Sequence, residues 1–174
     1  SRAEAVGSVL HAAHEKGLNA AGALLTQSSI LAVANRRGLF AAQAETYSNF
    51  TCTVRSPNSS GWVDRHRRDV RALDAERLGH TAIEKAERSR DPEPIEPGRY
   101  TVVLEPAAVA ELVGFLTSLG LGAQADQEGR SFMAGRMGQS ITGERATLVD
   151  DPYDPRAFGK PFDHEGTPRR RVVL

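Results

Sequence analysis

The stretch Val109-Ala110-Glu111-Leu112-Val113-Gly114-Phe115 decides how the second half of this chain is interpreted. It follows Glu105-Pro106, and proline suits the first turn of a helix because the N–H that it lacks would have no partner there. Apolar residues then recur at roughly helical spacing: Val109, Leu112, Val113, Leu116 and Leu119. This pattern predicts a helix over residues 106–119, and its apolar stripe is typical of an ordinary buried helix.

Other elements are predicted on both sides of this helix. The β-branched run 100–104 predicts a strand just before it. After it we expect a loop at 120–129, a short helix at 130–138 and a strand at 146–149. A loop rich in proline and glycine then covers 150–168, and the apolar end of the chain, from about residue 170, reads as a further strand.

The helix and three downstream segments resemble the TldD/PmbA family, once called modulators of DNA gyrase and now regarded as a metalloprotease system. The segments are Gly129–Phe132, Thr147–Pro152 and Pro161–Gly166. The zinc-bearing branch of that family carries His-Glu-x-x-x-His on the helix. Here Ala110 stands at the first histidine position and Phe115 at the second, whereas Glu111 and Gly114 match the family.

The two substituted positions determine what chemistry the resemblance implies. Catalytic zinc is bound by imidazole, thiolate or carboxylate groups, and neither the methyl group of Ala110 nor the phenyl ring of Phe115 has a lone pair to donate. Without a metal there is no activated water for Glu111 to deprotonate. The resemblance therefore implies the PmbA-like branch, also called TldE, which is the non-catalytic partner of the zinc subunit. No catalytic residue and no metal ligand is expected in this chain.

The resemblance also implies partners and a substrate. Zinc is expected in a TldD-like partner subunit that forms a heterodimer with this protein, and self-association is the alternative. The substrate would be an extended peptide, held by strand addition to a sheet edge. Candidates for the substrate cleft are Glu111, Phe115, Asp150 and Asp151. Family members are more than twice as long as this chain, so it is expected to be a central fragment.

Composition narrows the remaining classes of function. The 174 residues include 22 Lys and Arg against 22 Asp and Glu, so the formal net charge is zero. A neutral chain argues against general nucleic-acid binding, which needs a concentrated basic face. No apolar run reaches the roughly 18 residues that span a bilayer, so no membrane association is expected. The single cysteine, Cys52, excludes an intramolecular disulfide and favours the cytoplasm.

The N-terminal half has its own pattern of helices and strands. A helix is predicted over 2–16, ended by Gly17, and another over 75–90 with Asp74 as its N-cap. Between them, strands are predicted at 20–26, 29–35 and 39–55, and a further strand opens at Trp62. We expect Gln27-Ser28-Ser29 to separate the first two strands, a turn at 35–38, and a loop at 56–61.

The predicted fold class is α+β, with a helix–antiparallel sheet–helix unit followed by the start of a second mixed α/β unit. Three prolines within 91–98 separate the two units, because each removes a backbone donor and fixes φ. The predicted domains are therefore residues 1–91, a linker over 92–98, and residues 99–174, the truncated start of the family's C-terminal unit.

Four other patterns allow a functional interpretation beside a structural one. His11 and His14 on one helix could bind a metal, but no third ligand can be named. The basic cluster, which we define as the basic residues from Arg65 to Arg71, could bind an acidic partner, or it is a solvated strand end. Cys52 could act as a nucleophile, although a buried small residue is favoured.

The carboxylates of residues 150–166 could bind a hard cation or cap turns. For the whole protein, an active metallopeptidase with ligands outside the helix stays an alternative to the non-catalytic subunit.

Overall fold

The computed structural model describes residues 1–141 and 143–174, which form two compact units. The first unit combines Ser1–Ile95 with Val149–Leu174, and the second is Glu96–Leu148. Helices and an antiparallel sheet are both present, so the predicted α+β class is confirmed. Residues 149–174 group with the first unit rather than with the rest of the predicted domain 99–174. The domain boundary of the whole protein, with its linker at 92–98, stays a prediction.

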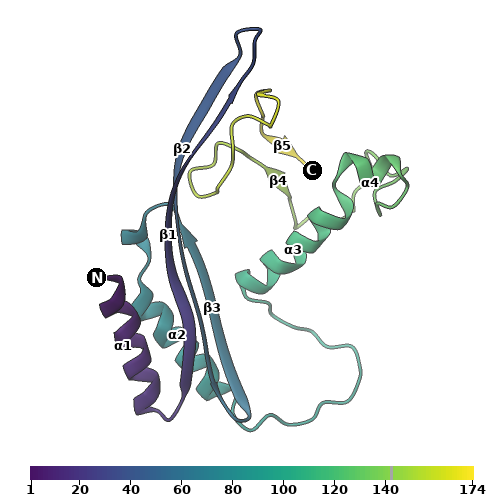
Figure 1. Cartoon of the computed structure of the whole chain (residues 1–174). Coiled ribbons are helices and arrows are strands. Elements are labelled where there is room, and N and C mark those ends of the chain that lie inside the picture. The colour runs from purple at the N-terminus through teal and green to yellow at the C-terminus, as the bar shows by residue number, and fades with distance from the viewer. Residues whose placement is uncertain (142) are drawn as a thin grey trace. The chain divides into compact units, whose positions relative to one another are not determined.

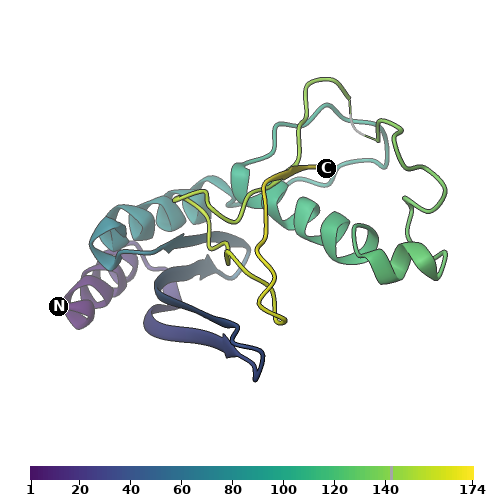
Figure 2. The same cartoon turned by 90° about the horizontal axis from the view of Figure 1, so that it is seen from above.

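The first unit is a three-stranded antiparallel sheet with two helices on one face (Figures 1 and 2). Its strands are β1 (Asn19–Ala34), β2 (Phe40–Ser56) and β3 (Ser59–Arg67), in the order β1-β2-β3. The helices α1 (Arg2–Glu15) and α2 (Ala75–Arg88) pack against the sheet and against each other. A single 3-10 turn, η1 (Val70–Ala72), connects β3 to α2. This is the predicted helix–sheet–helix arrangement.

The core lies between the sheet and the two helices. Alternate residues of β2 point into it, because successive strand residues face opposite sides of a sheet. The buried apolar residues of this core are Val9, Ala13, Leu18, Phe50, Cys52, Val54, Val63, Leu73, Ala75, Leu78, Ala82, Ile83 and Ala86. At Gly61 of β3 the backbone of α2 comes so close that a Cβ would overlap the carbonyl oxygen of Ala82. Glycine is therefore required for this strand and helix to touch.

Both predicted helices of this unit are confirmed, although α2 ends at Arg88, two residues before the predicted end. Gly17 follows α1 with φ +67°, a conformation that glycine adopts without steric cost. Asp74 caps α2, since its Oδ1 accepts a hydrogen bond from the backbone N–H of Arg77 at 3.0 Å.

Two predictions about the strands of this unit are wrong. Gln27-Ser28-Ser29 does not divide β1, because these residues pair with Tyr47, Thr46 and Glu45 in an unbroken ladder. Polar side chains fit there because the ladder needs only the backbone, and this part of the sheet is largely exposed. The predicted loop 56–61 is a tight turn at Pro57-Asn58, and Ser56 already pairs with Ser59.

Beyond β3, strands β1 and β2 continue as a two-stranded ribbon to the pair Ala34 and Phe40. The C-terminal segment 149–174 lies beside this ribbon (Figure 1). Gly166 lies against the side chain of Leu39, and the Gln43 side chain donates to the carbonyl oxygen of Gly159 at 3.5 Å. The segment holds a short antiparallel pair of strands, β4 (Val149–Asp150) and β5 (Val172–Val173). The strand predicted at the end of the chain is therefore confirmed. The strand predicted at 146–149 is shorter than expected, because β4 begins only at Val149.

The second unit contains α3 (Pro106–Gly120) and the short α4 (Ala123–Gln127). The predicted helix 106–119 is confirmed, but α4 lies in the predicted loop 120–129. Two other predictions here are wrong. Residues 100–104 form no strand, and Val103 is 99% exposed. Turns replace the predicted helix 130–138, because Gly135 and Gly138 adopt positive φ values of 72° and 81°. Across both described ranges, no helix is long and apolar enough to cross a membrane.

Candidate functional site

The helix α3 carries the residues on which the sequence interpretation rests. Pro106 stands in its first turn, and Glu105 is the N-cap residue. Ala110 and Glu111 are exposed, and the ring of Phe115 is 58% exposed. The side chains at the two histidine positions of the family are therefore a methyl group and a phenyl ring, both without a lone pair. Only Glu111 retains a group that could approach a metal, so this helix does not fit a zinc site.

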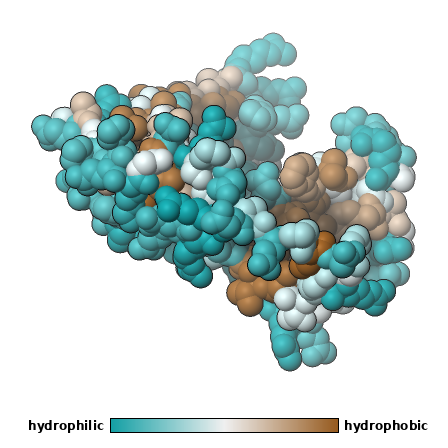
Figure 3. Space-filling view, turned by 90° about the horizontal axis from the view of Figure 1, so that it is seen from below, coloured by the Kyte–Doolittle hydropathy of each residue, from teal (hydrophilic) through white to brown (hydrophobic). Residues whose placement is uncertain are grey.

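The expectation that α3 is an ordinary buried helix is wrong. Gly120 is its only fully buried residue, whereas Leu112 is 59% exposed and Leu119 is 67% exposed. Figure 3 shows apolar side chains gathered on the surface of the unit that holds α3. Periodicity detects an apolar stripe correctly, but it does not reveal whether the surface that covers the stripe belongs to the same unit. An exposed apolar patch of this kind is typical of an interaction surface.

The end of α3 is fixed from within the second unit. Ser131 Oγ donates to the carbonyl oxygen of Gly120 at 2.5 Å and accepts from the backbone N–H of Met133 at 2.9 Å. The ring of Phe132 occupies the space that a side chain at position 120 would fill. Thus the motif Gly129–Phe132 has a structural role in ending the helix and turning the chain.

The aspartate carboxylates of residues 150–166 contact basic side chains and backbone amides of the same segment. Asp150 Oδ2 lies 2.7 Å from Nη2 of Arg169, and Asp151 Oδ2 lies 3.6 Å from Nε of Arg171. Asp163 accepts hydrogen bonds from the N–H groups of Thr167 and Glu165, both at 2.9 Å. These amides, that of Thr167 most of all, lower the pKa of Asp163. These contacts favour the interpretation that the carboxylates cap turns over the interpretation that they bind a cation.

The predicted substrate-cleft residues lie in different compact units. Asp150 and Asp151 belong to the first unit, whereas Glu111 and Phe115 belong to the second. Their joint role in one cleft stays a prediction.

The basic cluster is largely engaged in contacts within the chain. The guanidinium of Arg68 donates to the carbonyl oxygen of Ala157 at 2.7 and 3.1 Å and lies 5.5 Å from the centre of the Phe158 ring. Arg71 pairs with Asp69, with Nη2 and Oδ2 2.7 Å apart. Arg67 Nη1 donates to the carbonyl oxygen of His66 at 2.8 Å. Because these guanidinium groups already have partners within the chain, the basic cluster is better explained as a solvated strand end than as a binding site for an acidic partner.

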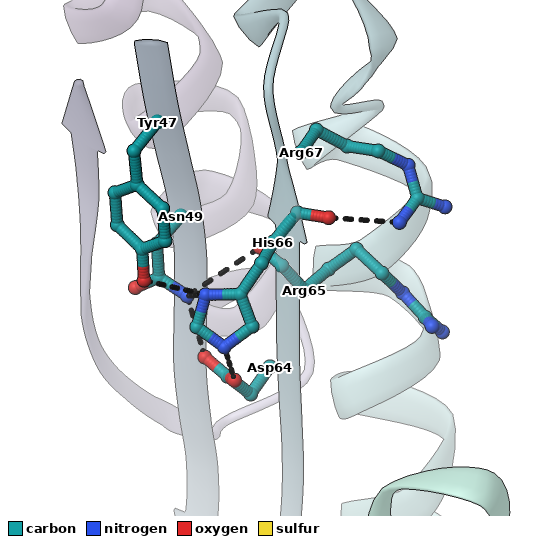
Figure 4. A network of polar contacts seen from close by, with 6 residues as sticks. All are labelled: Tyr47, Asn49, Asp64, Arg65, His66 and Arg67. Atoms are coloured by element: carbon teal, nitrogen blue, oxygen red, sulfur yellow. Dashed lines mark hydrogen bonds and ion pairs between the residues drawn. The ribbon is translucent and has the colours of Figure 1, made fainter. Parts of the chain in front are cut away.

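A polar network on the open face of the sheet was missed by sequence reasoning (Figure 4). The hydroxyl of Tyr47 lies 2.5 Å from Nδ1 of His66, and Oδ2 of Asp64 lies 2.6 Å from its Nε2. Asn49 Nδ2 donates to Oδ1 of Asp64 at 2.7 Å. Arg65 and Arg67 alternate with Asp64 and His66 along β3 and point away from the network (Figure 4). The signal that could have revealed it is the period-two spacing of these polar residues on two adjacent strands.

The remaining candidates have structural roles. His11 pairs with Glu15 across one helical turn, with Nε2 and Oε1 3.3 Å apart on the surface. Cys52 is buried, and burial raises the pKa of its thiol, so a reactive thiolate is disfavoured. Over residues 1–141 and 143–174, no group of three or more His, Cys, Asp and Glu side chains could hold a metal ion.

Comparison with known proteins shows which class of protein this fold and helix resemble. Residues 97–174 match the family model described as the PmbA/TldA metallopeptidase C-terminal domain. A protein of Methanothermobacter thermautotrophicus named metalloprotease is 34% identical over 105 residues, which are 58% of this chain and 22% of that protein. An uncharacterized protein of Methanocaldococcus jannaschii is 26% identical over 141 residues, 80% of this chain and 33% of its own length. By the match to the family model, residues 97–174 carry the C-terminal domain of the TldD/PmbA metallopeptidase family, and the chain is similar to a protein named metalloprotease.

Solved structures show that the fold extends over nearly the whole chain. A modulator of DNA gyrase from Bacteroides thetaiotaomicron superposes with a TM-score of 0.85 at 21% identity, over 99% of this chain and 41% of that one. TldE from Thermococcus kodakarensis superposes with a TM-score of 0.74 at 24% identity, over 99% of this chain and 41% of that one. The chain therefore spans about two fifths of the length of these structures, and less of the curated relatives.

Proposed function

We propose that this chain is the central part of a PmbA/TldE-like subunit, which serves a TldD/PmbA-type zinc metalloprotease complex without being catalytic itself. The observation that carries the proposal is the pair Ala110 and Phe115 on α3. Both stand where the zinc-bearing branch has histidines, and neither can bind a metal. Glu111, although it is kept, then has no metal-bound water to act upon.

The role proposed for the subunit is to bind or regulate a peptide substrate beside a zinc-bearing partner of the same fold. The exposed apolar side chains of α3 are a surface that either the rest of this polypeptide or such a partner would cover, because apolar side chains are stabilised when they are removed from water. An extended peptide could add to the outer edge of β1, which forms one edge of the sheet. No residue of β1 is charged or a proline, and these are the residues that normally protect a sheet edge.

The test is purification of the full-length protein from its host, followed by identification of what accompanies it. We expect a zinc protease of the same fold to co-purify and the isolated protein to hold no stoichiometric zinc. Peptidase activity of the complex should persist when Glu111→Gln is introduced here. Stoichiometric zinc in the isolated protein, together with peptidase activity lost in the Glu111→Gln variant, would refute the proposal.

An active metallopeptidase is the second candidate function. The relative from Methanothermobacter thermautotrophicus, which is named metalloprotease, favours it. In that case the ligands would have to come from residues outside α3. The same zinc analysis distinguishes the two candidates, since only the second requires metal in the isolated protein.

A further inference from the structure

A pocket of about 460 Å³ lies in the first unit between the sheet and the C-terminal segment. It is lined by Gln27, Ser29, Glu45, Tyr47, His66, Phe158 and Lys160. Three of these side chains carry aromatic rings that lie close together, tilted or edge to face. The ring centre of Tyr47 lies 5.4 Å from that of His66 and 5.2 Å from that of Phe158, and the last two centres are 6.4 Å apart. The rings therefore form an apolar wall around one side of the pocket.

Hydrogen bonds hold these rings in position without any ligand. The imidazole of His66 is held between Tyr47 and Asp64, one on each ring nitrogen. Phe158 is fixed by its neighbour, because Arg68 donates twice to the carbonyl oxygen of Ala157 and its guanidinium lies near the Phe158 ring. A wall held this way loses little conformational entropy when a ligand enters, which favours binding.

The polar groups of the pocket have opposite characters. Lys160 contributes an ammonium that forms no hydrogen bond or ion pair with the residues at 1–141 and 143–174. Glu45 contributes a carboxylate, which accepts from Ser29 Oγ at 3.3 Å, and Gln27 contributes an amide. A matching ligand would offer a carboxylate to Lys160, an N–H to Glu45 or Gln27, and an apolar group to the rings. The last residue of a peptide carries all three.

We propose that this pocket binds the C-terminal residue of a peptide, with its free carboxylate on Lys160 and an aromatic side chain packed against the rings of Tyr47, His66 and Phe158. The inference deepens the proposed function, because it assumes that peptides are the ligands of this protein. It adds a preference for one end of the peptide and for one class of side chain.

The experiment is a calorimetric titration of the full-length protein with acetyl-Ala-Ala-Phe as free acid, the same peptide as C-terminal amide, and acetyl-Ala-Ala-Ala as free acid. We expect the free acid ending in Phe to bind at least tenfold more tightly than either of the other two peptides. The amide loses the charge-assisted hydrogen bond to Lys160, and the peptide that ends in Ala loses the buried ring. N-acetyl-phenylalanine alone distinguishes a small aromatic acid from a longer peptide, and we expect it to bind more weakly than the tripeptide.

Two variants locate the binding. Lys160→Met should remove the preference for acid over amide, and Phe158→Ala should remove the preference for Phe over Ala at the last position. Arg37→Met is the matched control, since it deletes one exposed charge at the tip of the ribbon and should change neither preference. Thermal melts verify that each variant is folded, and Tyr47→Phe, which keeps the ring, should retain the Phe preference.

Equal affinity for acid and amide, an unchanged preference in Lys160→Met, or no binding at millimolar peptide would overturn the inference. These outcomes are separate from the test of the proposed function. A zinc protease that co-purifies while no peptide binds in this pocket would refute the inference alone. Peptide binding with the expected preferences but without a zinc partner would refute the proposed complex alone.

Discussion

At the scale of single residues, the chemistry of this chain depends on two side chains of one helix. Ala110 and Phe115 are exposed on α3 and lack donor atoms, whereas Glu111 between them is retained. Because a metal ligand needs a lone pair, these two residues alone distinguish a zinc site from its absence on this helix.

The substitution of both positions by histidine provides a direct prediction. In the double variant Ala110→His with Phe115→His, two imidazoles would flank Glu111, so we expect zinc to bind at least tenfold more tightly than to either single variant. Metal titration with a competing chelator measures the difference. The single variant Ala110→His serves as control, and equal zinc affinity in the single and double variants would contradict the prediction.

A second prediction at this scale concerns Asp163 and pH. Backbone amides, first that of Thr167, hold the pKa of this carboxyl below the ordinary aspartate value of 3.8. A depressed pKa in the folded state means that the ionised form supports the turn, so this support is complete above pH 3.8 and is lost as the pH falls through the lower folded value.

Nuclear magnetic resonance measures this effect through the amide shifts of Thr167 and Glu165 during acidification. We expect a midpoint below 3.8 in the wild type and no titration in Asp163→Asn, whose amide oxygen still accepts but carries no charge. A midpoint at or above that value would show that the amides do not stabilise the carboxylate.

At the scale of elements, the first unit is held together by close contact between β3 and α2. Gly61 permits this contact, because the carbonyl oxygen of Ala82 and the backbone nitrogen of Ala86 fill the space that a Cβ would need there. Gly79 has the same role between α2 and Val9 of α1. Backbone atoms cannot move aside as a flexible side chain can, so β3 and α2 must separate to admit a methyl group at position 61.

We therefore expect Gly61→Ala to lower the free energy of unfolding by about 1–3 kcal/mol, the usual cost of overpacking. Urea denaturation followed by circular dichroism measures the change. Gly7→Ala is the matched control, since Gly7 lies in α1 with no atom of another element within 4 Å of the place that a Cβ would take, and alanine is favoured in helices. Similar unfolding free energies for the two variants would mean that β3 and α2 are not in close contact.

At the scale of the whole molecule, most apolar side chains of α3 are exposed, because no other part of residues 1–141 and 143–174 buries them. Leu112 and Leu119 are more than half exposed, whereas the core of the first unit is complete without them. In the proposed complex this surface would be covered by another polypeptide segment, which would stabilise the assembly rather than the fold of the first unit.

The corresponding variant is Leu112→Glu with Leu119→Glu. We expect it to abolish co-purification of a partner and to leave the melting temperature of the first unit within about 2 °C of the wild type, because surface substitutions usually change stability by less than about 0.5 kcal/mol. Val103→Glu is the control, since Val103 is equally apolar and 99% exposed but lies outside the helix. Retention of the partner by the double variant would exclude α3 as the contact surface.

The sequence by itself determined the elements whose signals are local. Helix α1 with its glycine stop, helix α2 with its Asp74 cap and helix α3 with Pro106 follow from hydrogen-bonding and steric rules that act within one turn. The identity of Ala110 and Phe115 also needed no structure, because the absence of a donor atom is a property of the side chain alone.

Only the tertiary structure decided which surfaces meet. Residues 149–174 contact the ribbon of β1 and β2, more than a hundred positions earlier, and so create the pocket of Tyr47, His66 and Phe158. The exposure of α3 has the same origin. Hydrophobic burial depends on partners distant in sequence, and no local pattern encodes where those partners lie.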